Sequence, residues 1–449
     1  MLKTRIIATY GPSIEKESIL SQIIEKSDAI RINFAHTSTG EAKEIVEKIR
    51  SISKKLKKEV GILADLPGPK IRLGNINGEI EVKRKNVLMF SKEQRKDAIK
   101  INYKDLERIK EGTIFSIGEG TLKFKVKKNE KGVLTCEALT EGVLTSRKGV
   151  NFYNTELSIS SPTDEDIKLS QFCEKAGIDF LAESFVKESK DVEKLKKHSS
   201  SMEIIAKIER RQAIENLEEI ANAADAIMVA RGDLAFDVAI ESIPITQRKI
   251  IHVAREVGKP VIVATQALAS MVTNEMPTRA EVNDIAMAIY EGADAILLSD
   301  ETAVGKYPVN AVETLRRTAA YAEKMKEYEI INKPNTTMDY IAYAASDIAN
   351  KFGLNCIFAP TRTGTTAKRL SIFRPNTNII AISESEKVIR QLSIYKGVAT
   401  MYTDHYENQE ELLRLIDSLA DKIKAKKYII VYGSGKAGST DSLKYVEKA

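Results

Sequence analysis

Charged and hydroxyl side chains stand at the ends of short apolar runs in this 449-residue chain. Lys207 and Glu209 end one run, Arg231 and Asp233 end the next, and Thr265 ends a third. Carboxylate oxygens without a His or Cys cluster suit a hard divalent cation such as Mg2+. Arg and Lys beside them suit a phosphorylated substrate. Phosphoryl-group chemistry is therefore the first interpretation.

Eight such runs are short, β-branched-rich and nearly continuous, as is typical of parallel strands buried on both faces. They are Arg5–Tyr10, Ala29–Phe34, Val60–Leu66, Phe180–Phe185, Glu203–Glu209, Ala226–Asp233, Pro260–Gln266 and Ala295–Glu301. Helix-period stretches lie between them, so the chain repeats a βα unit. Eight such units predict a closed (β/α)8 TIM barrel, with an open doubly wound sheet as the alternative.

In such a barrel, the residues at the C-terminal ends of the strands line the active site. The ends of the runs carry Thr9, Arg31, Asn33, Asp65, Glu183, Ser184, Lys207, Glu209, Arg231, Asp233, Thr265, Gln266, Ser299 and Glu301. Taken singly, several have plainer interpretations. Lys207 could reach solvent, and Glu209 or Asp233 could cap a helix.

The third and fourth runs are separated by a much longer segment of alternating apolar stretches and Gly-containing turns. We therefore predict that the barrel, at 1–68 and 157–335, is interrupted after its third strand by a small β-barrel domain at 69–156. A polar linker at 332–337 then leads to alternating strands and helices, which predict a C-terminal α/β domain at 336–449.

The composition restricts the class of protein. With 43% hydrophobic and 29% charged residues, the chain can fill several cores and is neither disordered nor fibrous. No apolar run approaches about 18 residues, so no membrane span is expected, and the first residues do not have the pattern expected of a signal peptide. Three scattered cysteines favour reduced thiols in the cytoplasm. A diffuse net charge of +6 and the absence of Trp argue against a nucleic-acid partner.

Seven stretches, in order along the chain, closely resemble the pyruvate kinase family. They are Ala29–His36, Leu63–Arg72, Ala206–Glu209, Met228–Leu234, Ala264–Gln266, Pro277–Glu281 and Leu298–Pro308. The resemblance covers essentially the whole chain. It implies a phosphotransferase that moves the phosphoryl group of phosphoenolpyruvate to ADP, giving pyruvate and ATP in the last step of glycolysis. It also implies a homotetramer.

The resemblance assigns catalytic roles to the matching residues. Glu209 and Asp233 would hold Mg2+, for which Mn2+ can substitute, and Lys207 would stabilise the transferring phosphoryl group. Arg31 would contact the phosphate. The backbone N–H groups of Gly232 and Asp233, with the Thr265 hydroxyl, would bind the substrate carboxylate. Thr265 would also lie on the proton relay to the enolate, with Ser299 and Glu301 behind it.

The family pattern also implies a nucleotide site. Asn33, His36 and Arg72 match barrel-side contacts to ADP or ATP, and Lys148 matches a lysine that the small domain brings down as a lid. A lone histidine such as His36 is more often structural. After Asn151, the chain has Phe152–Asn154 where the family usually has Leu-Pro-Gly, so the lid hinge is expected to differ.

Three departures from the family pattern predict that K+ is not required. Members that need K+ have Ser at the position of Ala35, Thr at that of Leu66 and Glu at that of Lys70. The Lys70 ammonium would supply the charge that K+ brings, with Asn33 and Asp65 kept for local hydrogen bonds. A merely solvated Lys70 is the alternative. Asp300 replaces a family Gly behind Thr265.

The C-terminal domain resembles the part of the family that binds a phosphorylated allosteric effector and takes part in oligomerisation. Thr363, Gly364, Thr365 and Thr366 follow a predicted strand and open a helix, a pattern that cradles phosphate. A second Gly/Ser-rich loop spans 432–439. Both loops could instead be simple turns.

Two other classes of function stay open. One is another barrel enzyme that handles phosphoenolpyruvate or pyruvate, such as a carbon–carbon lyase or a dikinase. A dikinase needs a phosphorylatable His, for which none of the four histidines has the context, and a lyase would not need Lys148. The other is a non-catalytic sensor, against which the intact Lys207, Glu209 and Asp233 argue.

Overall fold

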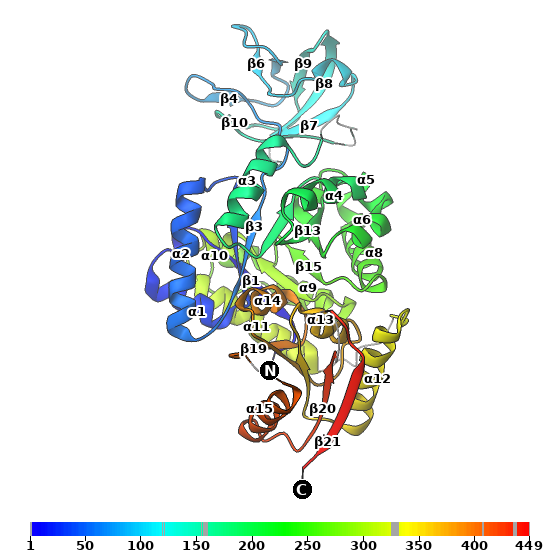
Figure 1. The fold of residues 1–449 in the computed structure, drawn as a ribbon. Helices are drawn as coiled ribbons and strands as arrows, with labels where there is room; N and C mark the ends of the chain where they lie inside the picture. Colours follow the sequence, from blue (N-terminus) through cyan, green and yellow to red (C-terminus); the bar gives the residue numbers. More distant parts are fainter. Residues whose placement is uncertain are drawn as a thin grey trace.

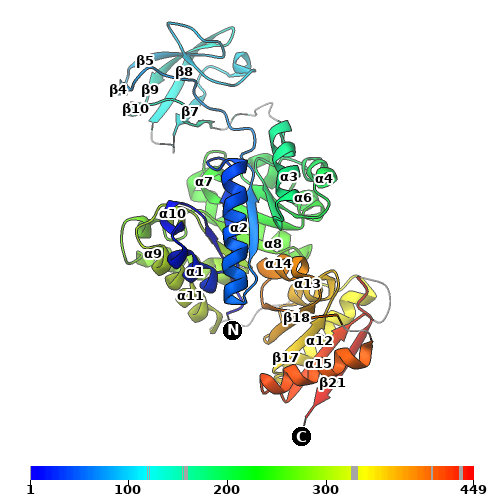
Figure 2. The same ribbon diagram turned by 60° about the vertical axis from the view of Figure 1, so that its left-hand side comes forward.

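The structure is a computed structural model that describes residues 2–118, 120, 122–153, 155, 160–324, 332–405, 408–433 and 438–448. Three units follow one another in space (Figures 1 and 2). A β-rich insertion lies at one end, an eight-stranded barrel in the middle, and an α/β unit at the opposite end. No helix of the described chain is both long and apolar enough to cross a membrane.

All eight predicted runs form the parallel strands of one closed barrel. In chain order these are β1 (Arg5–Thr9), β2 (Ala29–Asn33), β3 (Gly61–Asp65), β12 (Phe180–Glu183), β13 (Glu203–Ile208), β14 (Ala226–Ala230), β15 (Val261–Ala264) and β16 (Ala295–Leu298). Their spatial order is β1-β16-β15-β14-β13-β12-β3-β2. Nearly every strand residue is buried, because one face fills the barrel and the other packs on the helices. The closed barrel is confirmed over the open sheet.

Helices surround the strands as the periodicity predicted. The longer ones are α1 (Glu17–Lys26), α2 (Thr39–Leu56), α3 (Asp164–Lys175), α4 (Ser189–His198), α8 (Ile243–Glu256), α9 (Arg279–Glu291) and α11 (Pro308–Lys324). Ser38, Thr163 and Thr278 begin three of them with capping boxes. Between β13 and β14 the chain forms two short helices, α5 (Arg211–Glu215) and α6 (Leu217–Ala223). The break falls at Asn216, whose side-chain amide donates to the Lys187 carbonyl.

Two very short helices begin where barrel strands end. The helix α7 (Arg231–Leu234) follows β14 directly, and α10 (Asp300–Ala303) follows β16 after Ser299. Each therefore fixes the residues at a strand end through its own hydrogen bonds rather than through a long loop.

The insertion is mostly antiparallel, and its strands form two sheets. They are β4 (Ile80–Val82), β5 (Val87–Ser91), β6 (Ile99–Lys100), β7 (Ile114–Ile117), β8 (Leu122–Glu130), β9 (Val133–Ala138), β10 (Gly142–Leu144) and β11 (Val150–Phe152). Six pair in the order β11-β7-β8-β9-β5-β6, while β10 pairs with β4. The described strands thus close no ring of hydrogen bonds of the kind expected for a small barrel. Phe90, Phe115 and Phe124 pack together in their core.

The C-terminal unit is an α/β layer structure. It contains α12 (Thr337–Phe352), β17 (Cys356–Pro360), α13 (Thr365–Ile372), β18 (Asn378–Ser383), α14 (Glu386–Gln391), β19 (Val398–Tyr402), α15 (Gln409–Lys422), β20 (Lys427–Tyr432) and β21 (Ser442–Glu447). The strand order is β19-β18-β17-β20-β21, with β21 antiparallel to β20. The edge strand β21 was not predicted.

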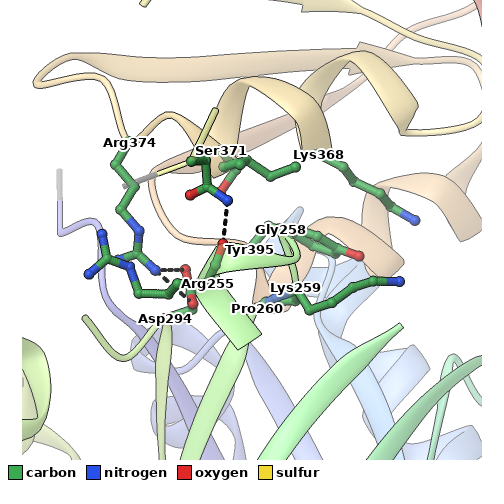
Figure 3. Close-up of a pocket in the computed structure, with 11 residues that line it drawn as sticks. Arg255, Gly258, Lys259, Pro260, Asp294, Lys368, Ser371, Arg374 and Tyr395 are labelled. Carbon is green, nitrogen blue, oxygen red and sulfur yellow. Dashed lines mark hydrogen bonds and ion pairs between the residues drawn. The ribbon is translucent and has the colours of Figure 1, made fainter. Parts of the chain in front are cut away.

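The C-terminal unit covers the N-terminal end of the barrel, opposite the insertion. Gly61 at the start of β3 lies so close to Ser393 that an added Cβ would come within 2.3 Å of its hydroxyl oxygen. Charged side chains join the two units around a small cavity (Figure 3). There Arg374 donates to Asp294 at 3.0 Å, and Lys368 pairs with Glu203 at the start of β13. Among the described residues, the C-terminal ends of the barrel strands therefore face the insertion.

Candidate active site

The predicted strand-end residues meet at a cavity of about 860 Å3 between the barrel and the insertion. Of the residues assigned roles above, the lining includes Arg31, Asn33, His36, Lys70, Arg72, Lys148, Glu209, Gly232, Asp233, Thr265, Ser299, Asp300 and Glu301. Lys207 and Asp65 do not line it and lie just beneath its floor. Thr9, Glu183, Ser184 and Arg231 were also predicted to line the site, but they do not line this cavity.

The Lys207 ammonium lies just beneath the cleft floor and joins several of the predicted residues. Its Nζ lies 2.7 Å from Glu209 Oε1 and 3.0 Å from Asp65 Oδ1, and it donates to Ser184 Oγ at 2.8 Å. Lys207 is only 8% exposed, so the alternative of a lysine that reaches solvent is wrong. Parallel strands β12 and β13 and the end of β3 bring these partners together.

Burial and charge act in opposite directions on these groups. Desolvation alone would lower the pKa of Lys207, but the carboxylates of Asp65, Glu209 and Asp233 outweigh it and raise that pKa. Burial likewise opposes ionisation of Asp65, yet Lys207 and Arg31 lower its pKa to about 2. The ammonium and the Asp65 carboxylate are therefore both charged at neutral pH.

Arg31 is held by the same aspartate. Its guanidinium nitrogens lie 2.8 and 2.6 Å from Asp65 Oδ2, and a third contact of 3.2 Å joins it to the Thr9 hydroxyl. A planar guanidinium fixed in this way presents its remaining donors to the cleft, where they suit a phosphate.

Glu209 and Asp233 supply the oxygens that could hold a metal ion. Glu209 is buried, accepts from the Phe185 N–H at 2.9 Å, and has its pKa raised by burial and by the charge of Asp233. Glu209 therefore does not cap a helix. Two neighbouring carboxylates that repel each other at a cleft fit a divalent cation. Among the described residues no three His, Cys, Asp or Glu side chains form a metal cluster.

Thr265 closes the other side of the floor. Its hydroxyl oxygen accepts from the Gly232 N–H at 2.9 Å, which leaves the hydroxyl hydrogen to donate. Its carbonyl accepts from the Arg231 guanidinium at 2.7 Å. Thr265 and Gln266 have φ of +67° and +54°, a region that L-residues rarely adopt. These contacts fix the threonine against α7 in a strained conformation.

Two independent models of known families match the chain. The model described as pyruvate kinase, barrel domain, matches residues 1–312, and the model described as pyruvate kinase, alpha/beta domain, matches residues 339–446. The chain belongs to the pyruvate kinase family. It is therefore an enzyme, a phosphotransferase.

Relatives and a solved structure agree over the full length. The chain is 37% identical to a pyruvate kinase of Thermococcus litoralis, with 93% of this chain and 92% of the relative covered. It is 38% identical to that of Clostridium perfringens, over 92% and 91% of the two chains. A crystal structure of a pyruvate kinase from Cryptosporidium parvum superposes with a TM-score of 0.91 at 30% identity, covering 100% of this chain and 96% of that one.

The basic residues that resemble the family's nucleotide contacts lie at the base of the insertion. The two connecting segments pair with each other, since the Leu73 N–H donates to the Lys148 carbonyl at 2.8 Å. Arg72 and Lys148 are thereby neighbours. Burial, with the charges of Lys70, Arg72 and Arg31, lowers the pKa of His36, so its imidazole is neutral at neutral pH. This end of the cleft has a cationic lining.

Glu301 has a structural task beyond what the family pattern implied. One of its oxygens accepts from the Leu268 N–H at 2.8 Å and the other from the Ser299 N–H at 2.7 Å. Its carboxylate therefore ties the segment after β15 to the segment after β16. It acts on Thr265 by holding these segments in place.

Other cleft residues were not predicted as site residues. Arg210 directly follows Glu209, lines the cavity, and places its guanidinium carbon 4.7 Å from the centre of the Phe185 ring. Arg210 follows the last residue of the apolar run Glu203–Glu209. A search that included one more residue after each run would therefore have found it. Phe236 and Gly118 also line the cavity, and no strand-end signal marks them.

The predicted effector loop of this family member has a defined geometry. Gly364, with φ of +83°, precedes α13, and its N–H donates to the Thr361 hydroxyl at 2.9 Å. The Thr366 and Thr440 hydroxyl oxygens lie 3.0 Å apart, so the residue that directly follows the second loop contacts the first loop. Residues 434–437 of that second loop lie outside the described residues.

Proposed function

We propose that this chain transfers the phosphoryl group of phosphoenolpyruvate to ADP and takes up one proton, giving pyruvate and ATP. The observation that carries the proposal is the buried Lys207 ammonium, held between Asp65, Ser184 and Glu209 beneath a cleft with a carboxylate end and a cationic end. A lyase acting on the same acids would have no use for the cationic end.

Lys207 and Arg31 would stabilise the phosphoryl group in transfer. In a loose transition state the negative charge spreads over the phosphoryl oxygens, and fixed cations stabilise it without reorganising. Both cations are already oriented by Asp65. Removing one such donor typically slows an enzyme by about 100- to 1,000-fold.

Glu209 and Asp233 would hold Mg2+, with Mn2+ as a substitute. When bound, the ion would neutralise negative charge on the substrate. The protein's own part is to present two carboxylates on one side of the cleft, with Lys207 beside Glu209.

Thr265 would bind the substrate carboxylate and assist the proton transfer to the enolate carbon. Its hydroxyl is fixed by the Gly232 N–H and its carbonyl by Arg231. The Asp233 N–H, in the short helix α7, would bind the same carboxylate. The Gly232 N–H donates to Thr265 in this structure, so it would have to exchange that partner for the substrate. Water is the expected carrier of the proton.

The nucleotide would lie at the cationic end, against Asn33, His36, Arg72 and Lys148. Because Lys148 belongs to the insertion, lid movement would bring it to the ADP phosphates. Lys70 lines the same end and its charge is felt by His36. We propose that this ammonium replaces K+, so the enzyme works without a monovalent cation.

The C-terminal unit would bind a phosphorylated effector at 363–366, where hydroxyl groups and the start of α13 converge. The family relationship favours a homotetramer in the cytoplasm. Neither proposal is needed for the reaction itself.

Phosphorus NMR tests the reaction directly. Phosphoenolpyruvate, ADP and Mg2+ are mixed with the protein, and the γ-phosphate signal of ATP is expected to grow as that of phosphoenolpyruvate falls, in equal amounts. Release of inorganic phosphate in place of ATP would contradict the proposal.

A further inference from the structure

One pair of aromatic rings joins the insertion to the barrel beside the cleft. The Tyr153 and Phe236 ring centroids lie 5.7 Å apart, with an interplanar angle of 67°, an edge-to-face contact. Gly120 packs against the same ring, because a Cβ added there would lie 3.2 Å from a Phe236 ring carbon. Two segments of the insertion thus rest on one barrel side chain.

Tyr153 is firmly part of the insertion. Its N–H donates to the Ile114 carbonyl at 2.9 Å, and the Lys123 ammonium lies 5.7 Å from its ring centroid. It directly follows β11, the strand that Lys148 precedes by two residues. A displacement of Tyr153 is therefore transmitted along one short strand to Lys148.

Phe236 is equally tied to the catalytic floor. Its N–H donates to the Asp233 carbonyl at 3.1 Å, immediately after α7. The ring pair therefore connects Lys148, at the cationic end of the cleft, with Gly232 and Asp233 at its carboxylate end.

We propose that Tyr153 and Phe236 are positioning residues whose ring contact sets the lid, and with it Lys148, relative to α7. The contact lies where the hinge sequence departs from the family pattern. The expected effect on the use of ADP rests on the proposed function. The ring contact itself does not depend on it.

The contact can be measured without any activity. The chain has no Trp, so Tyr153→Trp introduces the sole indole fluorophore of the full-length protein. Adding Phe236→Leu in this background is expected to increase the acrylamide quenching constant at least twofold. Tyr343→Leu, which removes a similar ring pair with Phe373 in the C-terminal unit, is the matched control and should leave quenching unchanged. Equal quenching with and without Phe236→Leu overturns the proposal.

The consequence for positioning is measured by steady-state kinetics. Tyr153→Leu and Phe236→Leu should each raise the KM for ADP about two- to twelvefold, the range expected for one aromatic pair, with less than a twofold change in the KM for phosphoenolpyruvate. The double variant should be no worse than the worse single variant, and Tyr153→Phe should stay within twofold of the original protein. Additive effects, or an equal rise in both KM values, overturn the positioning role. If the unsubstituted protein forms no pyruvate, the proposed reaction fails, and the quenching experiment still decides the contact.

Discussion

At the scale of single residues, the charge balance around Lys207 explains most of the site. The side chains of Asp65, Glu209 and Asp233 surround the Lys207 ammonium, and Asp65 also holds the Arg31 guanidinium. These residues all lie at the ends of apolar runs, so the sequence alone was enough to identify them as candidates. Arg210 and Phe236 were missed because their roles depend on neighbours from distant segments.

Replacing Lys207 tests the charge at the reacting centre. Lys207→Met should lower kcat by about 100- to 1,000-fold or more, because the variant loses the fixed cation at the phosphoryl group. ADP affinity, measured by isothermal titration calorimetry, should change less than twofold. Lys55→Met, at an exposed lysine of α2, is the control. Near-normal turnover would remove Lys207 from its assigned role.

Glu209→Gln tests the metal site. The variant removes one of two carboxylate charges and should shift the Mg2+ activation curve to higher concentration, by at least tenfold. The measurement is the initial rate against Mg2+ at saturating substrates. A superimposable curve would exclude Glu209 as a ligand.

Lys70→Glu tests the proposed substitute for K+. Reversing this charge should make activity depend on added K+ or abolish it, because the fixed ammonium is lost. Rates with and without 100 mM-scale K+ report the result. If the rate changes neither with the substitution nor with added K+, Lys70 is merely solvated.

At the scale of elements, the nearly continuous apolar runs predicted the strands of the barrel. The ends of helices and the edge strand depended on contacts between side chains and strands that are far apart in the chain. Eight apolar runs predict eight strands buried on both faces, a pattern that a closed barrel and an open doubly wound sheet share. The strand pairing decides for the closed barrel. The break between α5 and α6 falls at Asn216, whose side chain contacts the Lys187 carbonyl. The local sequence pattern does not predict this contact, because Lys187 lies far from Asn216 along the chain. Strand β21 has a mostly exposed pattern and forms by pairing with β20. The Tyr153–Phe236 contact likewise joins segments far apart in the chain.

The end of β12 carries a prediction about pH. Burial, and then the charge of Asp191, raises the pKa of Glu183 to about 8. Its second oxygen is buried without a hydrogen-bond partner among the described residues. Since the folded-state pKa lies above the unfolded value of about 4.3, the stabilising contribution is complete at low pH and is lost as the pH rises from about 4.3 through 8.

Glu183→Gln should remove this pH dependence. The Tm of the variant relative to the original protein should rise between pH 5 and pH 8.5, measured by thermal unfolding under matched buffers. Glu188→Gln, at an exposed glutamate nearby, is the control. A difference in Tm that does not change with pH would show that Glu183 is not the group responsible.

At the scale of the whole molecule, the barrel separates the insertion from the C-terminal unit, which lie at its opposite ends (Figures 1 and 2). The insertion faces the cleft, and the C-terminal unit closes the other end through Arg374, Lys368 and their acidic partners. Strand β13 spans the distance between them, starting at Glu203 and ending beside Lys207. The order of the three units followed from the sequence, while this polar interface did not, because each of its pairs joins separate domains.

The oligomeric state is the prediction that belongs to this scale. Light scattering of the purified protein should give a particle of four chains, as the family relationship implies. A monomer that retains full activity would contradict the tetramer and leave the reaction untouched.

The most direct test of the central claim is the initial rate of pyruvate formation from phosphoenolpyruvate, ADP and Mg2+ in a buffer free of K+ and NH4+. The predicted result is rapid, ADP-dependent formation of pyruvate, unchanged when K+ is added. Pyruvate that appears only after K+ is added would contradict the role of Lys70 alone. No pyruvate from folded protein in either buffer would contradict the proposed reaction.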